Sequence, residues 1–287
     1  MTRIRLALLA FLVTVLALPL VGQTPPEWTE PFPAHQVVGN VYYVGSRGLA
    51  SYLITTPEGH ILINSNLESS PALIKESVEK LGFKFSDVKI LLISHAHWDH
   101  DAGSAGIVKM TGAKYMVMDR DVDVVESGGK TDFQYADQNT YPAVKVDRVL
   151  HDGDTVQLGG TILTAHLTAG HTKGCTTWTL KVNDRGKSYN VVIVGSPNVN
   201  PGYKLVNNQK YPQIAADYEH GFQVLKSLPC DIFLGAHGAY YGMEEKFSRL
   251  LKAGSNRWVD PEGYKAYVAE REQAFRKKLE EQKATAR

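Results

Sequence analysis

Cysteine is scarce in this chain: there are two among 287 residues, Cys175 and Cys230. Two cysteines cannot form the disulfide framework that stabilises small secreted folds, so stability must come from a hydrophobic core. We interpret both as small buried thiols, with a single disulfide between them as the alternative.

The chain also lacks an excess of charge of one sign, since its formal net charge is +1. That balance argues against nucleic acid or an anionic membrane surface as a partner and favours a small-molecule substrate.

The apolar run at the N-terminus is too short to be a membrane span. Residues 6–20 are almost wholly apolar, which is about 15 residues against the ~20 that a spanning helix needs. Arg3 and Arg5 precede this run, and a small residue follows it within residues 21–23. The order is typical of a signal peptide, which we predict at residues 1–22, with a retained membrane anchor as the alternative. Cleavage would leave a periplasmic protein with no stable membrane association.

The rest of the chain, residues 23–287, has the composition and pattern of one globular domain. Hydrophobic residues make up 43% of the sequence and charged residues 21%, which is enough apolar material for a packed core. Composition and periodicity support one α/β or α+β domain, and two sheets packed face to face with helices outside satisfy the order of elements. We predict a monomer. Strands are expected at 36–44, 50–55, 60–64, 88–94, 114–118, 161–168, 176–182, 189–195 and 231–235, and helices from Ser70 (N-cap) to Gly82, at 214–228 and 243–253, and from Asp260 (N-cap) onward.

Four side chains that can bind a metal ion follow one apolar strand. His95, His97, Asp99 and His100 lie within six residues, directly after the strand expected at 88–94. Side chains alternate in direction along an extended chain, so His95 and His97 can point the same way. Asp99 continues that direction, whereas the side chain of His100 points the opposite way. Imidazole and carboxylate ligands without thiols suit zinc. A structural one-zinc site or a plain polar loop is the alternative, but structural sites favour cysteine and leave no open coordination position.

Two further histidines lie in settings that allow them to join this cluster. His171 follows Gly170, and His237 precedes Gly238 just after the strand expected at 231–235. The neighbouring glycines let the backbone turn so that an imidazole can reach inward. The other five histidines lack such settings, and we expect them to be surface or core residues: His35, His60, His151, His166 and His220.

The segment from His95 to His100, with His171 and His237 downstream, resembles the metallo-β-lactamase superfamily. The resemblance implies a four-layer αββα sandwich of two mixed sheets and two Zn²⁺ ions per chain. It assigns the first zinc to His95, His97 and His171, and the second to Asp99, His100 and His237.

The residue after the strand at 189–195 indicates which members of the superfamily this chain resembles. Much of the superfamily has an aspartate there that bridges both metals, and two β-lactamase subclasses have a cysteine, but this chain has Ser196. That combination resembles subclass three of the class B β-lactamases. The resemblance implies that Ser196 and Asn198 help to hold the substrate carboxylate, that Tyr203 lies near the β-lactam carbonyl, and that a water near Asp99 returns a proton to the leaving nitrogen.

The activity implied is hydrolysis of the β-lactam amide of penicillins, cephalosporins and carbapenems by a zinc-bound hydroxide, which would confer antibiotic resistance. The sequence departs from the family at Asn64, where an aspartate is common, and at Asn198, where a second serine is frequent. These departures concern efficiency and substrate range rather than the reaction class. Two alternatives remain: another hydrolase of this fold that acts on a lactone or thioester, and a periplasmic zinc-binding protein without turnover.

Overall fold

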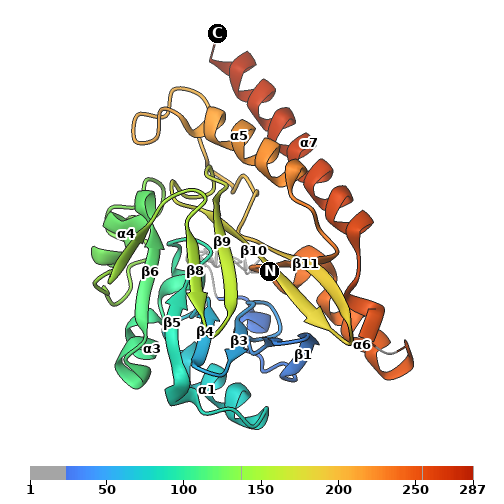
Figure 1. Ribbon diagram of the computed structural model, residues 1–287. Helices are drawn as coiled ribbons and strands as arrows, with labels where there is room; N and C mark the ends of the chain where they lie inside the picture. The colour runs from blue at the N-terminus through green and yellow to red at the C-terminus, as the bar shows by residue number, and fades with distance from the viewer. Residues whose placement is uncertain (1–23, 137, 254, 287) are drawn as a thin grey trace, which may run out of the picture.

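The chain folds as two β-sheets that face each other, with helices on both outer sides (Figure 1). The computed structural model describes residues 24–136, 138–253 and 255–286, so the predicted signal peptide lies outside the described residues. The first sheet contains, in spatial order, β1 (His35–Val38), β2 (Val41–Tyr43), β3 (Tyr52–Thr56), β4 (Gly59–Ile63), β5 (Val88–Leu92), β6 (Lys114–Met118) and β7 (Arg148–Leu150). The second contains β12 (Ile232–Gly235), β11 (Lys187–Val194), β10 (Thr176–Asp184), β9 (Thr161–Leu167) and β8 (Thr155–Leu158).

Alternation along the strands separates two hydrophobic layers. Ile61 and Ile63 of β4 pack between the two sheets, whereas Leu62 packs on the opposite face against helical residues such as Ile74. This alternation is the period of two that a strand with both faces covered requires. The α-helices are α1 (Ser70–Lys80), α2 (Trp98–Asp101), α3 (Ser104–Thr111), α4 (Val122–Glu126), α5 (Ile214–Ser227), α6 (Met243–Ala253) and α7 (Pro261–Thr285). The 3-10 helices are η1 (Pro26–Trp28), η2 (Phe85–Asp87), η3 (Asp119–Asp121), η4 (Gly238–Tyr241) and η5 (Ser255–Trp258).

Helices cover the outer face of each sheet. In Figure 1, α1, α3 and α4 flank the first sheet, and the long α7 runs beside α5. Phe222 of α5 and Phe275 of α7 place their rings 5.7 Å apart and belong to the same core as the second sheet. This architecture confirms the predicted αββα sandwich. In the part of the chain that the structure describes, no helix is both long enough and apolar enough to cross a membrane.

Most predicted elements are confirmed, with local corrections. The strand expected at 36–44 is wrong as one strand: Gly39, at φ +49°, turns the chain, and β1 pairs with β2 as a hairpin. The N-cap of α1 is Ser69 rather than Ser70, and no side chain caps this helix. Asp260 does cap α7, because its carboxylate accepts a hydrogen bond from the Gly263 amide at 2.9 Å.

Both cysteines are free thiols in the structure. Cys175 is buried, as predicted, but Cys230 is only partly buried, so the prediction of two buried thiols holds for one of them. The sulfur of Cys175 accepts a hydrogen bond from the backbone amide of Ser196, in the loop after β11, at 3.2 Å. The core therefore forms without a disulfide.

Candidate metal centre

Four predicted ligands lie in loops that follow strands at one edge of the sandwich, and Asp99 and His100 lie in the short helix α2 that follows His97. His95 comes three residues after the end of β5, His171 lies between β9 and β10, and His237 comes two residues after β12. Backbone hydrogen bonds draw these loops together, such as the one from Thr176 to the Ser94 carbonyl at 2.7 Å. Ligands in α/β proteins commonly bind where strands end at such an edge. The fold therefore brings together histidines that are far apart in sequence.

Local geometry fits each loop to its histidine. Asp99 and His100 belong to the single-turn helix α2, which redirects their side chains relative to the extended residues before it. Gly170 has φ +132°, and a Cβ atom there would lie 2.6 Å from the ring of Tyr218. Only glycine fits this close approach without displacing the ring. The position of His171 thus depends on the glycine before it.

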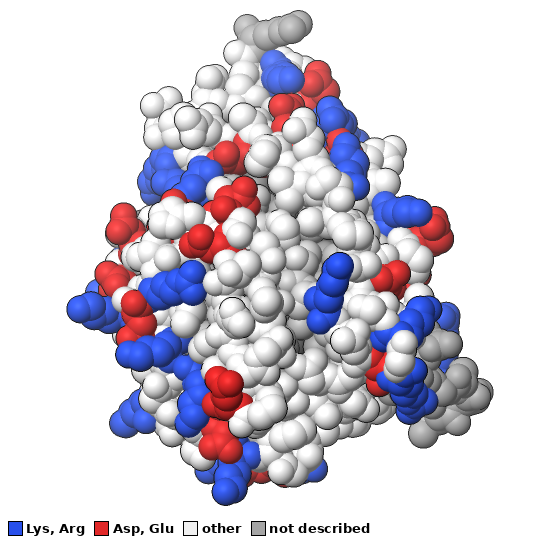
Figure 2. Space-filling view, viewed as in Figure 1, with Lys and Arg blue, Asp and Glu red and all other residues white. Residues whose placement is uncertain are grey.

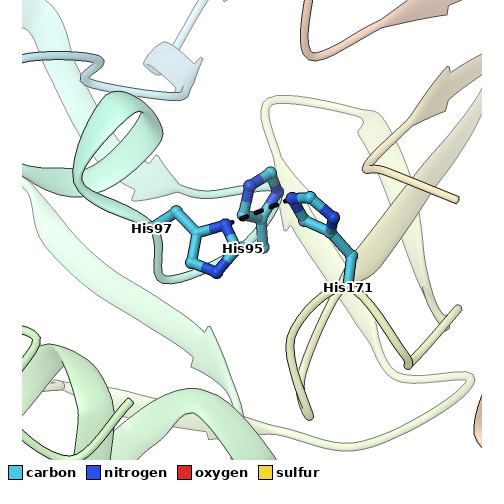
Figure 3. A group of neighbouring side chains, drawn as sticks. All are labelled: His95, His97 and His171. Carbon is cyan, nitrogen blue, oxygen red and sulfur yellow. Dashed lines mark hydrogen bonds between the residues drawn. The ribbon is translucent and has the colours of Figure 1, made fainter. Parts of the chain in front are cut away.

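The first predicted trio comes together closely. Nδ1 of His97 lies 3.1 Å from Nε2 of His171. The ring centroid of His95 lies 4.9 Å from that of His97 and 4.6 Å from that of His171. Figure 3 shows the three imidazoles pointing toward one another from two separate loops. One ligand atom from each of the three residues lies within 4.8 Å of the others, a spacing that can hold a metal ion.

The second predicted trio also converges. Nε2 of His100 lies 3.0 Å from Nε2 of His237 and 3.2 Å from Oδ2 of Asp99. The same carboxylate oxygen lies 3.6 Å from Nε2 of His237. His95 stands between the two trios, because ligand atoms of His95, Asp99 and His100 also lie within 4.8 Å of one another. The structure therefore brings all six predicted residues into one cluster.

Hydrogen bonding shows that the cluster fits a cation. Nδ1 of His171 donates to the Asn198 carbonyl at 2.8 Å, so Nε2 of the neutral ring carries a lone pair. Oδ2 of Asp132, 3.7 Å from Nε2 of His97, favours the proton on that nitrogen and a lone pair on Nδ1. Two lone pairs then face each other at 3.1 Å, and within the described part of the chain both buried ring nitrogens of His95 lack a hydrogen-bond partner. A metal ion between them would satisfy all three rings.

Burial keeps these imidazoles in the neutral form that binds metal. Burial is the main cause that lowers the pKa of His97 to about 4, of His171 and His237 to about 3, and of His95 well below its ordinary value. Burial alone would raise the pKa of Asp99, but His100 and the other nearby imidazoles outweigh it and hold that pKa below its usual range. Five imidazoles and one carboxylate are a donor set suited to a divalent transition metal.

One buried aspartate, Asp121, ties together the two loops that carry the first trio. Its Oδ2 accepts hydrogen bonds from the Ala96 amide at 3.0 Å and the Thr172 hydroxyl at 2.6 Å, and its Oδ1 accepts one from the Gly174 amide at 2.8 Å. Burial raises the pKa of Asp121 to about 6, which leaves it ionised at neutral pH. Sequence analysis missed this residue, because a single aspartate in a polar stretch carries no pattern.

A cleft of about 420 Å³ opens onto the cluster. Four of the six predicted ligands line it, and His95 and His100 lie behind them, each 1% exposed or less. Aromatic side chains form much of the wall: Trp28, Trp98, Tyr135 and Tyr240. Sequence analysis missed Trp28, which lies in η1, before the first predicted strand and outside every motif. The Trp28 ring lies 5.6 Å from that of Trp98 and 5.9 Å from that of His237.

The three predicted substrate-binding residues are placed differently from one another. Asn198 lines the cleft. Ser196 and Tyr203 are each 1% exposed and lie behind the cleft wall. The Tyr203 hydroxyl donates to the His171 carbonyl at 2.8 Å and lies 3.4 Å from Nε2 of His97. This placement braces two predicted ligands, and the contact of Tyr203 with a substrate carbonyl stays a prediction.

Comparisons with known proteins agree with this geometry. The family model of the metallo-beta-lactamase superfamily matches residues 44–184. The native FEZ-1 metallo-beta-lactamase from Legionella gormanii is 57% identical, with a TM-score of 0.87 over 88% of this chain and 98% of that one. BJP-1, a subclass B3 metallo-beta-lactamase of Bradyrhizobium japonicum, is 37% identical, with a TM-score of 0.84 over 91% of this chain and 99% of that one.

Curated relatives are more distant and less specific in name. A UPF0173 metal-dependent hydrolase from Anaeromyxobacter dehalogenans is 28% identical over 71% of this chain and 67% of its own length. Another from Cupriavidus necator is 27% identical over 65% of this chain, which spans 60% of that protein. Identity, coverage and fold together show that this chain belongs to the metallo-β-lactamase superfamily, as a hydrolase of that fold that resembles its subclass B3.

Proposed function

We propose that this protein hydrolyses the amide bond of β-lactam antibiotics with two zinc ions and thereby confers resistance to them. The observation that carries the proposal is the pair of trios, three imidazoles beside two imidazoles and a carboxylate, at the floor of one cleft. Ser196 supports the subclass, since its hydroxyl lies behind the cleft wall, 3.2 Å from the Tyr240 hydroxyl, where other members carry a metal-binding carboxylate or thiol.

The six candidate ligands would bind the two zinc ions as two trios. His95, His97 and His171 would hold one zinc, and the second trio would hold the other: Asp99, His100 and His237. Bound zinc supplies a Lewis acid and lowers the pKa of a water ligand to about 7. Asp99, kept ionised by its imidazole neighbours and open to the cleft, can orient a water and pass a proton toward the leaving nitrogen.

The shape of the cleft suits a small molecule with an apolar substituent. Trp28 and Trp98 form a tilted aromatic pair on one side of the cleft, and Tyr135 lines it as well. Such surfaces bind flat or apolar groups by burial. Of the residues that line the cleft in the described structure, Asp99 alone carries a carboxylate, so most of the wall is uncharged.

Replacement of Asp99 by asparagine tests the proposal. The change keeps the size of the side chain but removes its charge, so turnover of a carbapenem and a cephalosporin by purified, zinc-loaded protein should fall by about 10²–10⁴-fold. Chelation with EDTA should abolish the wild-type activity, and added zinc should restore it. Asp123→Asn, an exposed position on α4, is the matched control and should behave as wild type.

The same assay separates the rival activities. A lactone and a thioester belong in the substrate panel, because the curated relatives are metal-dependent hydrolases without a stated substrate. Turnover of either one with none of a β-lactam would replace the proposed substrate class. If the protein hydrolyses none of these compounds in an EDTA-sensitive way, the result would favour a zinc-binding protein without turnover. Full activity of zinc-loaded Asp99→Asn protein would refute the role of that carboxylate.

We also propose that the protein is exported and acts in the periplasm. The support is the order of a basic start, an apolar stretch and small residues within residues 1–22. Export fits the proposed activity, because an enzyme in the periplasm would meet β-lactams before they reach targets that lie outside the cytoplasm. Fractionation of cells that express the full chain, with mass determination of the mature N-terminus, checks this assignment.

A further inference from the structure

One end of the cleft is built from hydrogen-bonding side chains. Tyr240 of η4 and Asn198 both line the cleft. Nδ2 of Asn198 donates to the hydroxyl oxygen of Tyr240 at 2.8 Å, and Oγ of Ser196 lies 3.2 Å from the same oxygen. The ring of Tyr240 lies 5.0 Å from that of His237. An amide and two hydroxyls therefore converge beside a predicted metal ligand.

The guanidinium of Arg271, which also forms an ion pair with Glu270, lies behind this group. Nη1 of Arg271, on α7, donates to Oδ1 of Asn198 at 3.4 Å. The guanidinium also lies over the ring of Tyr267, 5.9 Å from its centroid, and that ring stacks on Tyr240 at 5.2 Å. With its oxygen toward Arg271, Asn198 must turn its amide hydrogens toward Tyr240. The direction of the chain of hydrogen bonds is thus set by a positive charge.

The backbone of Asn198 fixes this group relative to the metal centre. Its carbonyl accepts hydrogen bonds from Nδ1 of His171 at 2.8 Å and from the Tyr218 hydroxyl at 2.6 Å. A substrate held at Asn198 and Tyr240 is therefore held at a set distance from the first trio. Such positioning supports turnover, since a bound substrate must reach the reacting atoms in a fixed pose.

Counting protons shows that one donor remains for a ligand. The Tyr240 oxygen accepts from Asn198, and the contact between the Tyr240 and Ser196 hydroxyls uses only one of their two protons. Ser196 is 1% exposed, whereas Tyr240 is partly exposed on the cleft wall. Of these two hydroxyls only that of Tyr240 belongs to a residue that lines the cleft, so a substrate would meet its proton there when Ser196 donates to the Tyr240 oxygen. A phenol donor backed by a cation is suited to a carboxylate.

We propose that the Tyr240 hydroxyl, oriented by Asn198 and Arg271, donates the hydrogen bond that holds the carboxylate of an anionic substrate, in place of the buried Ser196. The inference rests on the proposed function, because the substrate class is the carboxylate-bearing β-lactams. Tyr240 contacts the part of the substrate that does not react. Its loss therefore weakens binding and leaves the chemical step unchanged.

The test compares Tyr240→Phe with wild type on benzylpenicillin and on its methyl ester. For the free acid, KM should rise about tenfold while kcat stays unchanged, because one hydrogen bond to a charged group is lost. For the ester, the two proteins should have the same KM. Tyr267→Phe is the matched control: it removes, from the neighbouring ring of the same stack, a hydroxyl that has no hydrogen-bond partner among the described residues.

Arg271→Gln supplies a second variant that leaves the phenol in place. It should raise KM for the free acid and not for the ester, because the neutral side chain no longer supplies the charge behind Asn198. An unchanged KM for the free acid in Tyr240→Phe protein, or an equal rise for the ester, would overturn the inference. If wild type hydrolyses neither compound, the proposed function fails, and calorimetry with intact benzylpenicillin decides separately whether binding depends on Tyr240.

Discussion

At the scale of single residues, Asn64 shows how a departure from the family pattern can suit its own site. Its Oδ1 accepts a hydrogen bond from the Ser94 amide at 2.7 Å, and its Nδ2 donates to the Ala50 carbonyl at 3.3 Å. An aspartate could accept the first bond but could not make the second. The backbone at Asn64 has φ +67°, a region that asparagine adopts more readily than most residues. Asn64 therefore supports the residue before His95 without charge.

Asp121 is not a predicted metal ligand, yet we expect the zinc affinity of the first site to depend on it. Asp121→Asn would place an amide NH₂ against one of the N–H or O–H donors that now point at the carboxylate, and so loosen the loops of His95 and His171. We expect zinc affinity to fall about 10–100-fold. Competition with a chromophoric chelator measures this, with Asp123→Asn as the exposed control. Equal zinc affinity in Asp121→Asn and wild type would show that the loops hold their positions without that carboxylate.

At the scale of elements, the sequence predicted the parts of the site that follow a periodic pattern. The buried strand before His95 and the strand before His237 both have such a pattern, and both are confirmed. The six candidate ligands were predictable because their residue types and spacing are rare in combination. The resemblance to a known family then supplied the sandwich, which periodicity alone left open between α/β and α+β.

Other elements of the site could not be predicted, because their roles arise from contacts between distant segments. Residues 24–34 show no regular sequence pattern, yet Trp28 packs on Trp98 and lines the cleft. Tyr240 follows His237 by three residues, but its pairing with Asn198 depends on how two loops meet. Short turns are also weak signals: Gly39 breaks one predicted strand into a hairpin. Long-range contacts of this kind need the folded structure.

At the scale of the whole molecule, the buried histidines make stability depend on pH. Histidine in an unfolded chain titrates at about 6.5, whereas burial lowers the folded pKa of His97 to about 4 and of His171 and His237 to about 3. Below pH 6.5 the unfolded state therefore binds more protons, and the free energy of unfolding falls as pH falls, by about 2 kcal/mol per histidine down to pH 5. Asp101 and Asp121, whose pKa burial raises to about 7 and about 6, offset part of this loss.

Urea unfolding of the metal-free protein measures this dependence. The free energy of unfolding should be lower at about pH 5 than at about pH 7.5, since the histidine contribution exceeds the opposing one from the two aspartates. An equal or higher value at the lower pH would contradict the neutral, buried state of the cluster.

The proposal that two zinc ions in one cleft carry out β-lactam hydrolysis is tested most directly by titrating metal-free protein with zinc while a carbapenem is present as substrate. The structure places six ligands in two adjoining trios. We therefore predict that the rate of carbapenem hydrolysis rises from zero and reaches its plateau at two zinc ions per chain. A chain that takes up zinc and hydrolyses no carbapenem at any zinc content would contradict the proposal.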